Sequence, residues 1–485
     1  MRENARGMPA VEPHHGRAEG VGDEPMVTRA RSVVVIASDF PPLAGTNTQR
    51  IQSFVKYLPE FAWTPCVVTR SVDDMLLIDS SQMKNLPDGL VVRRCASPDP
   101  FLWLRRRRHR QPHDIAISKA QTDTPSTNAR PASGRWPILS LSGLLKTALR
   151  YLAYLPDDQM LWGRVAARAA RRLIVETGAD VLLTSCPTYS THVAGLWVKR
   201  KTGVFWIADF RDLWVGRPGR AVPSRWHDYW DRKLEAAVLR QADAIVVLSP
   251  PWKERLCKRY DDMQLADKIT VVTNGFDSGK MPRRSEHVPD RPRIVFTNTG
   301  AMYGSESPAP FIEALGEVLA AHPDARDRVE VRLIGYAGDE WPKVHEIMRR
   351  YDLEGVVHYL GPQSHPRCLE EQMSADVLLL FSGLEHEETI RGKSYEYMAT
   401  GKTILALIPT TGIQAELLRG AGTAHIVQHG DVASTRQLLS DLISKPALRA
   451  MAPDWAYIRQ FERRTLTQRL VGVLEAAVAA GRKDK

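Results

Sequence analysis

Residues 388–409 read Glu388-Thr-Ile-Arg-Gly-Lys393-Ser-Tyr-Glu396-Tyr-Met-Ala-Thr-Gly401-Lys-Thr-Ile-Leu-Ala-Leu-Ile-Pro409. The stretch predicts three consecutive elements: a polar loop that begins at Glu388, a short helix over residues 393–400, and a strand over residues 403–408. Gly401 suits the left-handed position that follows a helix. The apolar run after it is typical of a strand in a buried parallel sheet. The stretch therefore predicts a loop-helix-strand unit of an α/β domain.

The start of this predicted helix has the chemistry of a phosphate site. A helix N-terminus presents free backbone N–H groups and the positive end of the helix dipole. Arg391 and Lys393 add formal positive charge there. Glu396 lies near the same helix end, and a carboxylate can accept two hydrogen bonds from a vicinal diol such as a ribose. A solvated helix that carries surface charges is the competing interpretation.

The pattern resembles the donor site of retaining GT-B glycosyltransferases of family 4. Seven residues separate Glu388 from Glu396, and the closer similarity is to the subgroup that reads Gly-Lys-x-x-Glu-Tyr-x-Ala-x-Gly-x-Pro-Ile-Leu-Ala. One departure is Thr403, where that pattern has proline. The resemblance implies that Glu396 holds the nucleotide ribose and that Glu388 lies beside the donor sugar as a catalytic residue. The other donor-binding residues that it implies in this stretch are Arg391, Lys393 and Ser394.

Length and composition indicate a soluble protein of several domains. The chain has 485 residues, which is too many for one core and predicts two or three domains. A net charge of +10 favours anionic partners such as nucleotide phosphates or acidic lipid surfaces. The 5 cysteines are scattered without metal-ligand spacing, which indicates a reducing compartment. We expect no membrane-spanning helix, because the chain has no apolar run of about 18 residues.

Strands that alternate with helices in two successive sets predict an α/β fold with two Rossmann-like domains facing a cleft, the GT-B architecture. The resemblance adds a C-terminal helix, predicted over residues 455–479, that crosses back to the first domain. The expected parts are a disordered tail (1–30), a first domain for the acceptor (31–277) with a basic and apolar insertion (96–155), a linker (278–292), a second domain for the nucleotide-sugar (293–452), and the C-terminal crossing helix and tail (453–485).

Two stretches of the first domain place polar residues after predicted strands. The strand that ends in Asp209-Phe-Arg-Asp212-Leu-Trp214 puts two carboxylates where parallel sheets bind ligands, and Asp212 is our candidate catalytic contact with the acceptor hydroxyl. A salt bridge between Asp209 and Arg211 is the alternative. His192 follows the strand over residues 180–185, and the resemblance places it beside the donor sugar. A packed or surface histidine is the alternative there.

Two glycine loops complete the predicted donor site. In the first domain, the resemblance makes Gly45 part of the loop at the donor and Arg50 the arginine that follows it. In the second domain, Gly300 ends a predicted strand. The family often has an arginine and a lysine shortly after this glycine for the diphosphate, whereas this chain has Ala301-Met-Tyr-Gly-Ser-Glu306. Arg391 and Lys393 are therefore expected to carry the phosphate contact alone.

The insertion contains an aromatic and basic cluster, Phe101-Leu-Trp-Leu-Arg-Arg-Arg-Arg-His-Arg110, followed by an apolar stretch over residues 136–155. One interpretation is a patch that lies in the plane of an anionic membrane surface. The other is a solvated charge run beside an ordinary core helix. Nucleic-acid binding fits less well, because the cluster stands alone and nothing nearby is suited to reading bases.

The resemblance implies transfer of a sugar from a nucleotide-sugar donor to a hydroxyl group of a carbohydrate or lipid-linked acceptor, in cell-surface polysaccharide or lipid-linked glycan synthesis. The resemblance also implies a retaining reaction. We expect no metal, since no Asp-x-Asp follows a strand to hold one, and no cofactor. The expected location is cytoplasmic, with a peripheral position on the inner face of the membrane left open. A nucleotide-sugar epimerase and a catalytically degenerate nucleotide-binding membrane partner are the alternatives.

Overall fold

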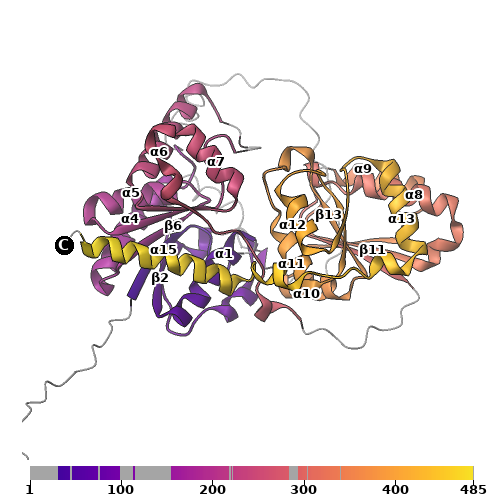
Figure 1. Ribbon diagram of the computed structural model, residues 1–485, viewed down its shortest axis with the longest axis horizontal. Coiled ribbons are helices and arrows are strands. Elements are labelled where there is room, and N and C mark those ends of the chain that lie inside the picture. The colour runs from indigo at the N-terminus through magenta and orange to yellow at the C-terminus, as the bar shows by residue number, and fades with distance from the viewer. Residues whose placement is uncertain are drawn as a thin grey trace, which may run out of the picture. The chain divides into compact units, whose positions relative to one another are not determined.

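The computed structural model describes residues 31–43, 46–74, 77–98, 113–114, 155–217, 220, 222–282, 293–302, 304–338 and 340–483. The predicted tail (1–30), Gly45, residues 283–292 of the linker and most of the insertion, including its basic cluster, lie outside the described residues. The part that is described contains two large parallel β-sheets, each flanked by helices on both faces (Figure 1). This α/β architecture confirms the predicted fold class.

The first sheet has seven parallel strands in the order β4-β2-β1-β6-β7-β8-β9. Its strands are β1 (Arg31–Ala37), β2 (Trp63–Arg70), β4 (Val91–Cys95), β6 (Val181–Ser185), β7 (Phe205–Phe210), β8 (Ala244–Val247) and β9 (Ile269–Val271), and β3 (Leu77–Ile78) pairs separately with β5 (His113–Asp114). The central strands form because β-branched and aliphatic residues are buried on both faces. Chain order reverses between β1 and β6, and such a switch point opens a crevice at the carboxyl ends of the strands.

Helices cover both faces of this sheet. The flanking helices are α1 (Thr46–Tyr57), α4 (Met160–Thr177), α5 (Ser190–Thr202), α6 (Arg225–Gln241), α7 (Pro250–Arg259) and α15 (Arg463–Lys483). Apolar residues of α4 to α7 form one core, and those of α1 and α15 form the core on the other face. Leu466 and Leu470 of α15 share this second core with Val33 of β1, so the C-terminal helix packs on the first sheet.

The second sheet has six parallel strands in the order β12-β11-β10-β13-β14-β15. Its strands are β10 (Ile294–Thr299), β11 (Val329–Ile334), β12 (Val357–Gly361), β13 (Val377–Phe381), β14 (Thr403–Leu407) and β15 (Ala424–Val427). Its helices are α8 (Ala309–Ala321), α9 (Trp341–Arg350), α10 (His365–Ser374), α11 (Gly392–Thr400), α12 (Ile413–Ala421), α13 (Val432–Ser444) and α14 (Trp455–Arg459). The cores of α8, α9 and α13 and of α11, α12 and α14 lie on opposite faces.

The stretch from residue 388 to 409 folds as predicted. Helix α11 is followed by Gly401, whose φ of 65° is left-handed, and β14 follows immediately. The prediction of one helix over residues 455–479 is wrong, because α14 ends at Arg459 and α15 begins at Arg463. The helix is interrupted between these two residues because the backbone there bonds to Phe276 instead. The Phe461 carbonyl accepts a hydrogen bond from Phe276 N–H, and Arg463 N–H donates to the Phe276 carbonyl.

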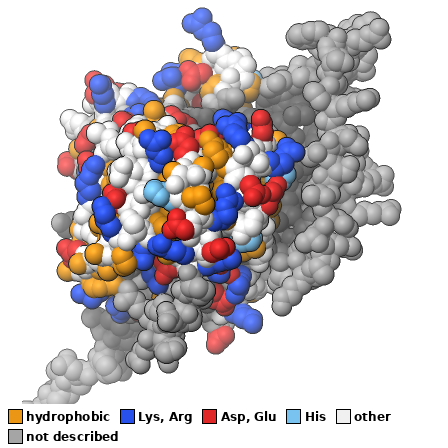
Figure 2. Space-filling model, turned by 90° about the vertical axis from the view of Figure 1, so that its right-hand side faces the viewer, with side chains coloured by type: hydrophobic (Ala, Val, Ile, Leu, Met, Phe, Trp, Pro, Cys, Tyr) orange, Lys and Arg blue, Asp and Glu red, His pale blue; other side chains and the backbone are white. Residues whose placement is uncertain are grey.

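Acidic and basic side chains are interspersed on the face shown in Figure 2, which is the right-hand side of Figure 1, where α8 and α13 lie. Such a mixed surface is typical of a solvated face rather than of a binding surface for a polyanion. None of the helices in the described ranges is long and apolar enough to span a membrane.

Candidate active site at the start of α11

Helix α11 is anchored so that its first turn faces the end of β10. Tyr395, Tyr397 and Met398 are buried in the core below the helix. The Tyr397 hydroxyl accepts a hydrogen bond of 2.8 Å from the backbone N–H of Thr299, the last residue of β10. Arg391 occupies the N-cap position, and no described side chain caps the helix there. Free backbone donors at the helix start therefore lie close to the loop that follows β10.

Lys393 is the central cation of this helix end. Its Nζ atom is buried and has no hydrogen-bond partner among the residues that the structure describes. Gly300 adjoins the lysine, because a Cβ atom built on Gly300 would lie 3.6 Å from Lys393 Cδ and 3.7 Å from Nζ. Burial lowers the pKa of Lys393 to about 8, although the nearby Glu306 carboxylate acts in the opposite direction. The structure thus brings together Gly300 and Lys393, two of the predicted donor-binding residues.

Other buried donors without hydrogen-bond partners among the described residues lie on residues next to Lys393 in the sequence or bonded to the start of α11. The buried polar atoms without a partner include Arg391 Nε, Ser394 Oγ and Gln414 Nε2, and Gln414 Oε1 accepts a hydrogen bond of 2.9 Å from Arg391 N–H. Buried polar atoms in folded proteins nearly always have a hydrogen-bond partner. All three atoms can donate a hydrogen bond, and their residues either start α11 or bond to it. Such a group of donors is suited to a ligand that accepts hydrogen bonds.

Glu396 lies further along α11 and its carboxylate is held in place by two side chains. Its Oε1 atom lies 2.8 Å from Nε2 of His365, and its Oε2 atom accepts a hydrogen bond of 3.4 Å from Gln372. Gln372 also donates to Thr299 Oγ1 at 2.9 Å, which ties the carboxylate to the end of β10. Burial raises the pKa of Glu396, but His365 and Gln372 outweigh burial and leave the pKa below its ordinary value. Glu396 is therefore an ionised acceptor.

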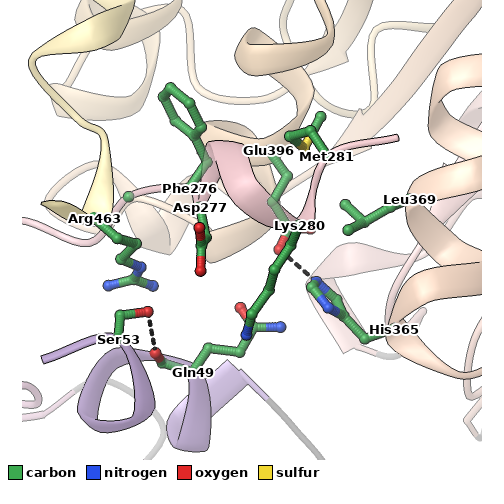
Figure 3. A pocket seen from close by; sticks show the side chains of 11 residues that line it. Gln49, Ser53, Phe276, Asp277, Lys280, Met281, His365, Leu369, Glu396 and Arg463 are labelled. Atoms are coloured by element: carbon green, nitrogen blue, oxygen red, sulfur yellow. Dashed lines mark hydrogen bonds and ion pairs between the residues drawn. The ribbon is translucent and has the colours of Figure 1, made fainter. Parts of the chain in front are cut away.

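Figure 3 shows the pocket into which Glu396 and His365 project. The lining residues come from α1, from the segment between the sheets, from α10 and α11 and from the start of α15: Gln49, Ser53, Gly275, Phe276, Asp277, Lys280, Met281, His365, Leu369, Glu396 and Arg463. Lys280 donates to Gln52 of α1 at 2.7 Å, and burial lowers the pKa of Lys280 to about 8. Arg463 Nη1 is buried, and no residue in the described ranges forms a hydrogen bond with it.

Glu388 lines a different hollow, together with Trp252, Asn274 and Ile413. Its carboxylate forms an ion pair of 2.7 Å with Arg255 of α7, and its side chain is 43% exposed. The two glutamates of the predicted motif therefore lie in separate pockets. Glu396 lies on the helix, whereas Glu388 lies on the loop that precedes it.

The end of β7 in the first domain is a paired cluster. Asp209 is 1% exposed and accepts hydrogen bonds of 3.0 and 2.8 Å from Arg50 and one of 2.7 Å from Ser185. Asp209 thus forms an ion pair with Arg50, whereas the alternative interpretation paired it with Arg211. Asp212 is partly exposed and lies 3.6 Å from Arg217.

His192 is fully buried at the start of α5. Its Nδ1 atom lies 2.8 Å from Thr184 Oγ1, and its ring stacks on Phe210 at a centroid distance of 4.5 Å. Burial lowers the pKa of His192 to about 3, so the ring is neutral. Neither His192 nor Asp212 lines the pockets that contain Glu396 and Glu388.

Sequence reasoning missed several residues of this site, notably His365, Gln372, Gln414 and Glu306. His365 and Glu306 each follow a strand at its carboxyl end, which was a usable signal. Gln372 and Gln414 lie on neighbouring helices, and only tertiary packing brings them to α11. Within the described part of the chain, no group of three or more His, Cys, Asp and Glu residues could hold a metal ion.

Residues 124–280 match the model of Glycosyltransferase Family 4. The fold is similar to HepE of Anabaena in complex with UDP and glucose, with a TM-score of 0.61 and 14% identity over 92% of this chain and 100% of that chain. Sucrose-phosphate synthase of Thermosynechococcus elongatus gives a TM-score of 0.56 and 15% sequence identity, over 93% of this chain and 100% of that chain. The apo form of the lipopolysaccharide outer core galactosyltransferase WaaB gives a TM-score of 0.52 and 13% sequence identity, over 92% of this chain and 99% of that chain.

No curated protein sequence matches the chain. At these identities the structural likeness establishes the fold, and it confirms the predicted two-sheet GT-B architecture. The family match confirms the predicted resemblance over residues 124–280. Together, the two comparisons indicate a glycosyltransferase. The narrower subgroup motif around Lys393 stays a prediction.

Proposed function

Because a family 4 glycosyltransferase model matches residues 124–280 and the fold is of the GT-B type, we propose that this chain transfers a sugar from a nucleotide-sugar to a hydroxyl group of an acceptor. The observation that carries the proposal is the buried Lys393 ammonium, which adjoins Gly300 at the start of α11 and has no hydrogen-bond partner in the described part of the chain. A buried ammonium without a hydrogen-bond acceptor is costly, and a bound phosphate group would supply acceptors.

The donor's diphosphate is proposed to bind at Lys393, the Gly300 loop and the first N–H groups of α11. The ribose diol would then bind to the Glu396 carboxylate, which His365 and Gln372 hold in place. HepE binds UDP and UDP-glucose, which supports a nucleoside diphosphate sugar as the donor class. The sugar itself stays open.

The proposed chemistry is electrostatic. As the bond between the anomeric carbon and the diphosphate breaks, negative charge grows on the leaving oxygen. The Lys393 ammonium and the N-terminal end of α11 would stabilise that charge in a partly desolvated site. We propose that the reaction retains the anomeric configuration and that Lys393, rather than a divalent ion, supplies the charge. Asp212 is the proposed partner of the acceptor hydroxyl, since it is partly exposed beside the buried pair of Arg50 and Asp209.

Two other predicted contacts have weaker support. Glu388 is half-exposed on the loop before α11 and remains the proposed neighbour of the donor sugar. His192 is fully buried and would reach a sugar only after a movement of α5, so the proposal does not depend on it. The acceptor is proposed to be a carbohydrate or a lipid-linked glycan, made on the cytoplasmic side, with binding to the membrane surface as an open part of the proposal.

A thermal-shift panel of nucleotide-sugars tests the proposal. A ligand at 100 times its Kd stabilises the folded chain by about 2.7 kcal/mol, which gives a clear rise in Tm. We expect one nucleotide-sugar to raise the Tm and Glu396→Ala to abolish that rise. Glu370→Ala is the matched control, because Glu370 is an exposed carboxylate that pairs with Arg367 on α10, outside the pocket.

A transfer assay with the selected donor then separates the alternatives. Sugar transfer that needs an acceptor supports the proposal, and isomerised donor without an acceptor supports an epimerase. A degenerate nucleotide-binding protein would bind the donor and convert none of it. The proposal fails if no nucleotide-sugar binds, or if Glu396→Ala and Lys393→Ala both leave transfer intact.

A further inference from the structure

The loop after β10 brings a carboxylate to the proposed phosphate site. Glu306 ends a short 3-10 helix, Gly304–Glu306, and its Oε1 atom lies 3.0 Å from Nη2 of Arg391. Both side chains are largely buried, with 12% of Glu306 and 22% of Arg391 exposed. One of the two cations expected to bind phosphate is therefore already paired.

This pair lowers the positive charge that the site offers a ligand. Lys393 and Arg391 contribute two positive charges, and Glu306 removes one of them. Glu385 also faces Arg391, but its side chain is 56% exposed and is screened by water. His386 carries little charge near neutral pH, because burial and the proximity of Arg391 lower its pKa. The start of α11 thus offers a net charge near +1 rather than +2.

We propose that Glu306 determines how the site discriminates between the nucleotide-sugar and the nucleoside diphosphate product. The inference rests on the proposed glycosyl transfer. In that reaction the bond between the anomeric carbon and the terminal phosphate oxygen breaks, and a bond to the acceptor oxygen forms. The bonding electron pair stays on the phosphate oxygen, and the proton of the acceptor hydroxyl passes to the solvent. The terminal phosphate gains an ionisable oxygen whose pKa is about 6, so the product carries nearly one more negative charge than the donor at neutral pH.

A site with two uncompensated cations would hold the more highly charged product more tightly than the donor. Glu306 weakens this preference, because the carboxylate competes with the terminal phosphate for Arg391 and repels the additional charge. It repels the donor less, since the donor carries less charge. The consequence is that Glu306 favours release of the product and limits product inhibition.

The test is the ratio of two dissociation constants in the Glu306→Gln variant. Calorimetry with UDP and UDP-glucose at pH 7.5 gives the Kd of each ligand for the wild-type protein and the variant. We expect Glu306→Gln to bind UDP more tightly and to shift the ratio toward UDP by about three- to tenfold, the size of one charge interaction at partly buried distances. The shift is expected to shrink at higher salt.

Two variants sharpen the result. Glu317→Gln removes the same charge from an exposed pair with Arg436 and is expected to leave the ratio unchanged. Glu306→Ala is expected to shift the ratio in the same direction as Glu306→Gln. A uniform loss of affinity for both ligands would overturn the inference, because it would show that Glu306 only positions Arg391. An unchanged ratio would also overturn it and leave the proposed transfer standing. Failure of the wild-type protein to bind any nucleotide or nucleotide-sugar would overturn both.

Discussion

The end of β7 and the start of α11 both bury charged side chains at the carboxyl edge of a parallel sheet, but their hydrogen bonding differs. At β7, the Asp209 carboxylate accepts two hydrogen bonds from Arg50 and one from Ser185. At α11, no described residue forms a hydrogen bond with the Lys393 ammonium. Among the described residues, the Arg50–Asp209 pair is a complete cluster of hydrogen bonds, and the start of α11 is an incomplete one.

This difference separates structural charges from functional ones. A buried ion pair whose hydrogen bonds are satisfied holds elements together, and it loses stability when one partner is removed. A buried cation without a partner reduces stability until a ligand supplies the missing charge. We therefore propose that the Arg50–Asp209 pair belongs to the scaffold and that the start of α11 binds the ligand. The motif that follows β7, residues 209–214, then contributes mainly to the fold of the first domain. Asp212 is its one residue that is exposed enough to contact a substrate.

The largest expected effect comes from breaking the complete cluster. Arg50→Ala leaves the Asp209 carboxylate buried without its ion partner, and it also removes the hydrogen bonds from Arg50 to the Val272 and Thr273 carbonyls. We expect a loss of about 3–5 kcal/mol in the free energy of unfolding, measured by urea denaturation.

Arg93→Ala is the control for this substitution, because Arg93 pairs with Glu176 at a surface where both side chains are more than half exposed. Its expected cost is below about 1 kcal/mol. Equal costs for the two variants would contradict the distinction between a scaffold pair and a surface pair.

A substitution at Lys393, in the incomplete cluster, should have the opposite effects: stability is kept and activity is lost. Lys393→Met removes the buried ammonium, so the unliganded protein is expected to keep or gain stability. Transfer is expected to fall by about 10²- to 10³-fold, because the leaving diphosphate loses a charge-stabilising donor. Urea denaturation and initial rates with the selected nucleotide-sugar measure the two effects. Lys445→Met, at an exposed lysine that pairs with Asp441, should leave both unchanged. A large loss of stability in Lys393→Met would place Lys393 in the scaffold instead.

The same contrast explains what the sequence could predict. Helix α11, Gly401 and β14 follow from local periodicity and glycine preference, and the nearness of Gly300 to Lys393 follows from both lying at strand and helix ends. The partner of Asp209 could not be derived from spacing, because Arg50 lies 159 residues away and only the packing of α1 on the sheet brings it there. Likewise, His365 reaches Glu396 across 31 residues.

Motif spacing alone also could not show where Glu388 and Glu396 point. Glu396 follows the helix to the pocket that contains His365, whereas Glu388 precedes the helix and pairs with Arg255 in another hollow. Glu306 was visible in the sequence as a departure from the arginine and lysine of the family. Its effect on charge became clear only when the structure paired it with Arg391.

The smallest expected effect concerns pH and tests whether Lys393 is the cation that binds the ligand. Burial lowers the pKa of Lys393 to about 8, so the free site loses its ammonium charge as pH rises through that value. Affinity for the nucleoside diphosphate should therefore decline above pH 8, by at most about tenfold per pH unit. The charged groups that face Lys393 are Glu306 and Arg391.

The free energy of unfolding of the unliganded protein should rise with pH over the range in which the affinity declines. The unfolded lysine titrates near pH 10.4, so between about pH 8 and 10 the unfolded chain binds more protons than the folded chain, and this group makes the free energy of unfolding rise with pH. Binding should also raise the pKa of Lys393, since the phosphate favours the charged form. Calorimetry in buffers of different ionisation enthalpy is then expected to detect proton uptake on binding near pH 8. Lys393→Arg should abolish this uptake, because arginine stays charged. Wild-type binding without proton uptake at that pH would show that a group other than Lys393 receives the phosphate.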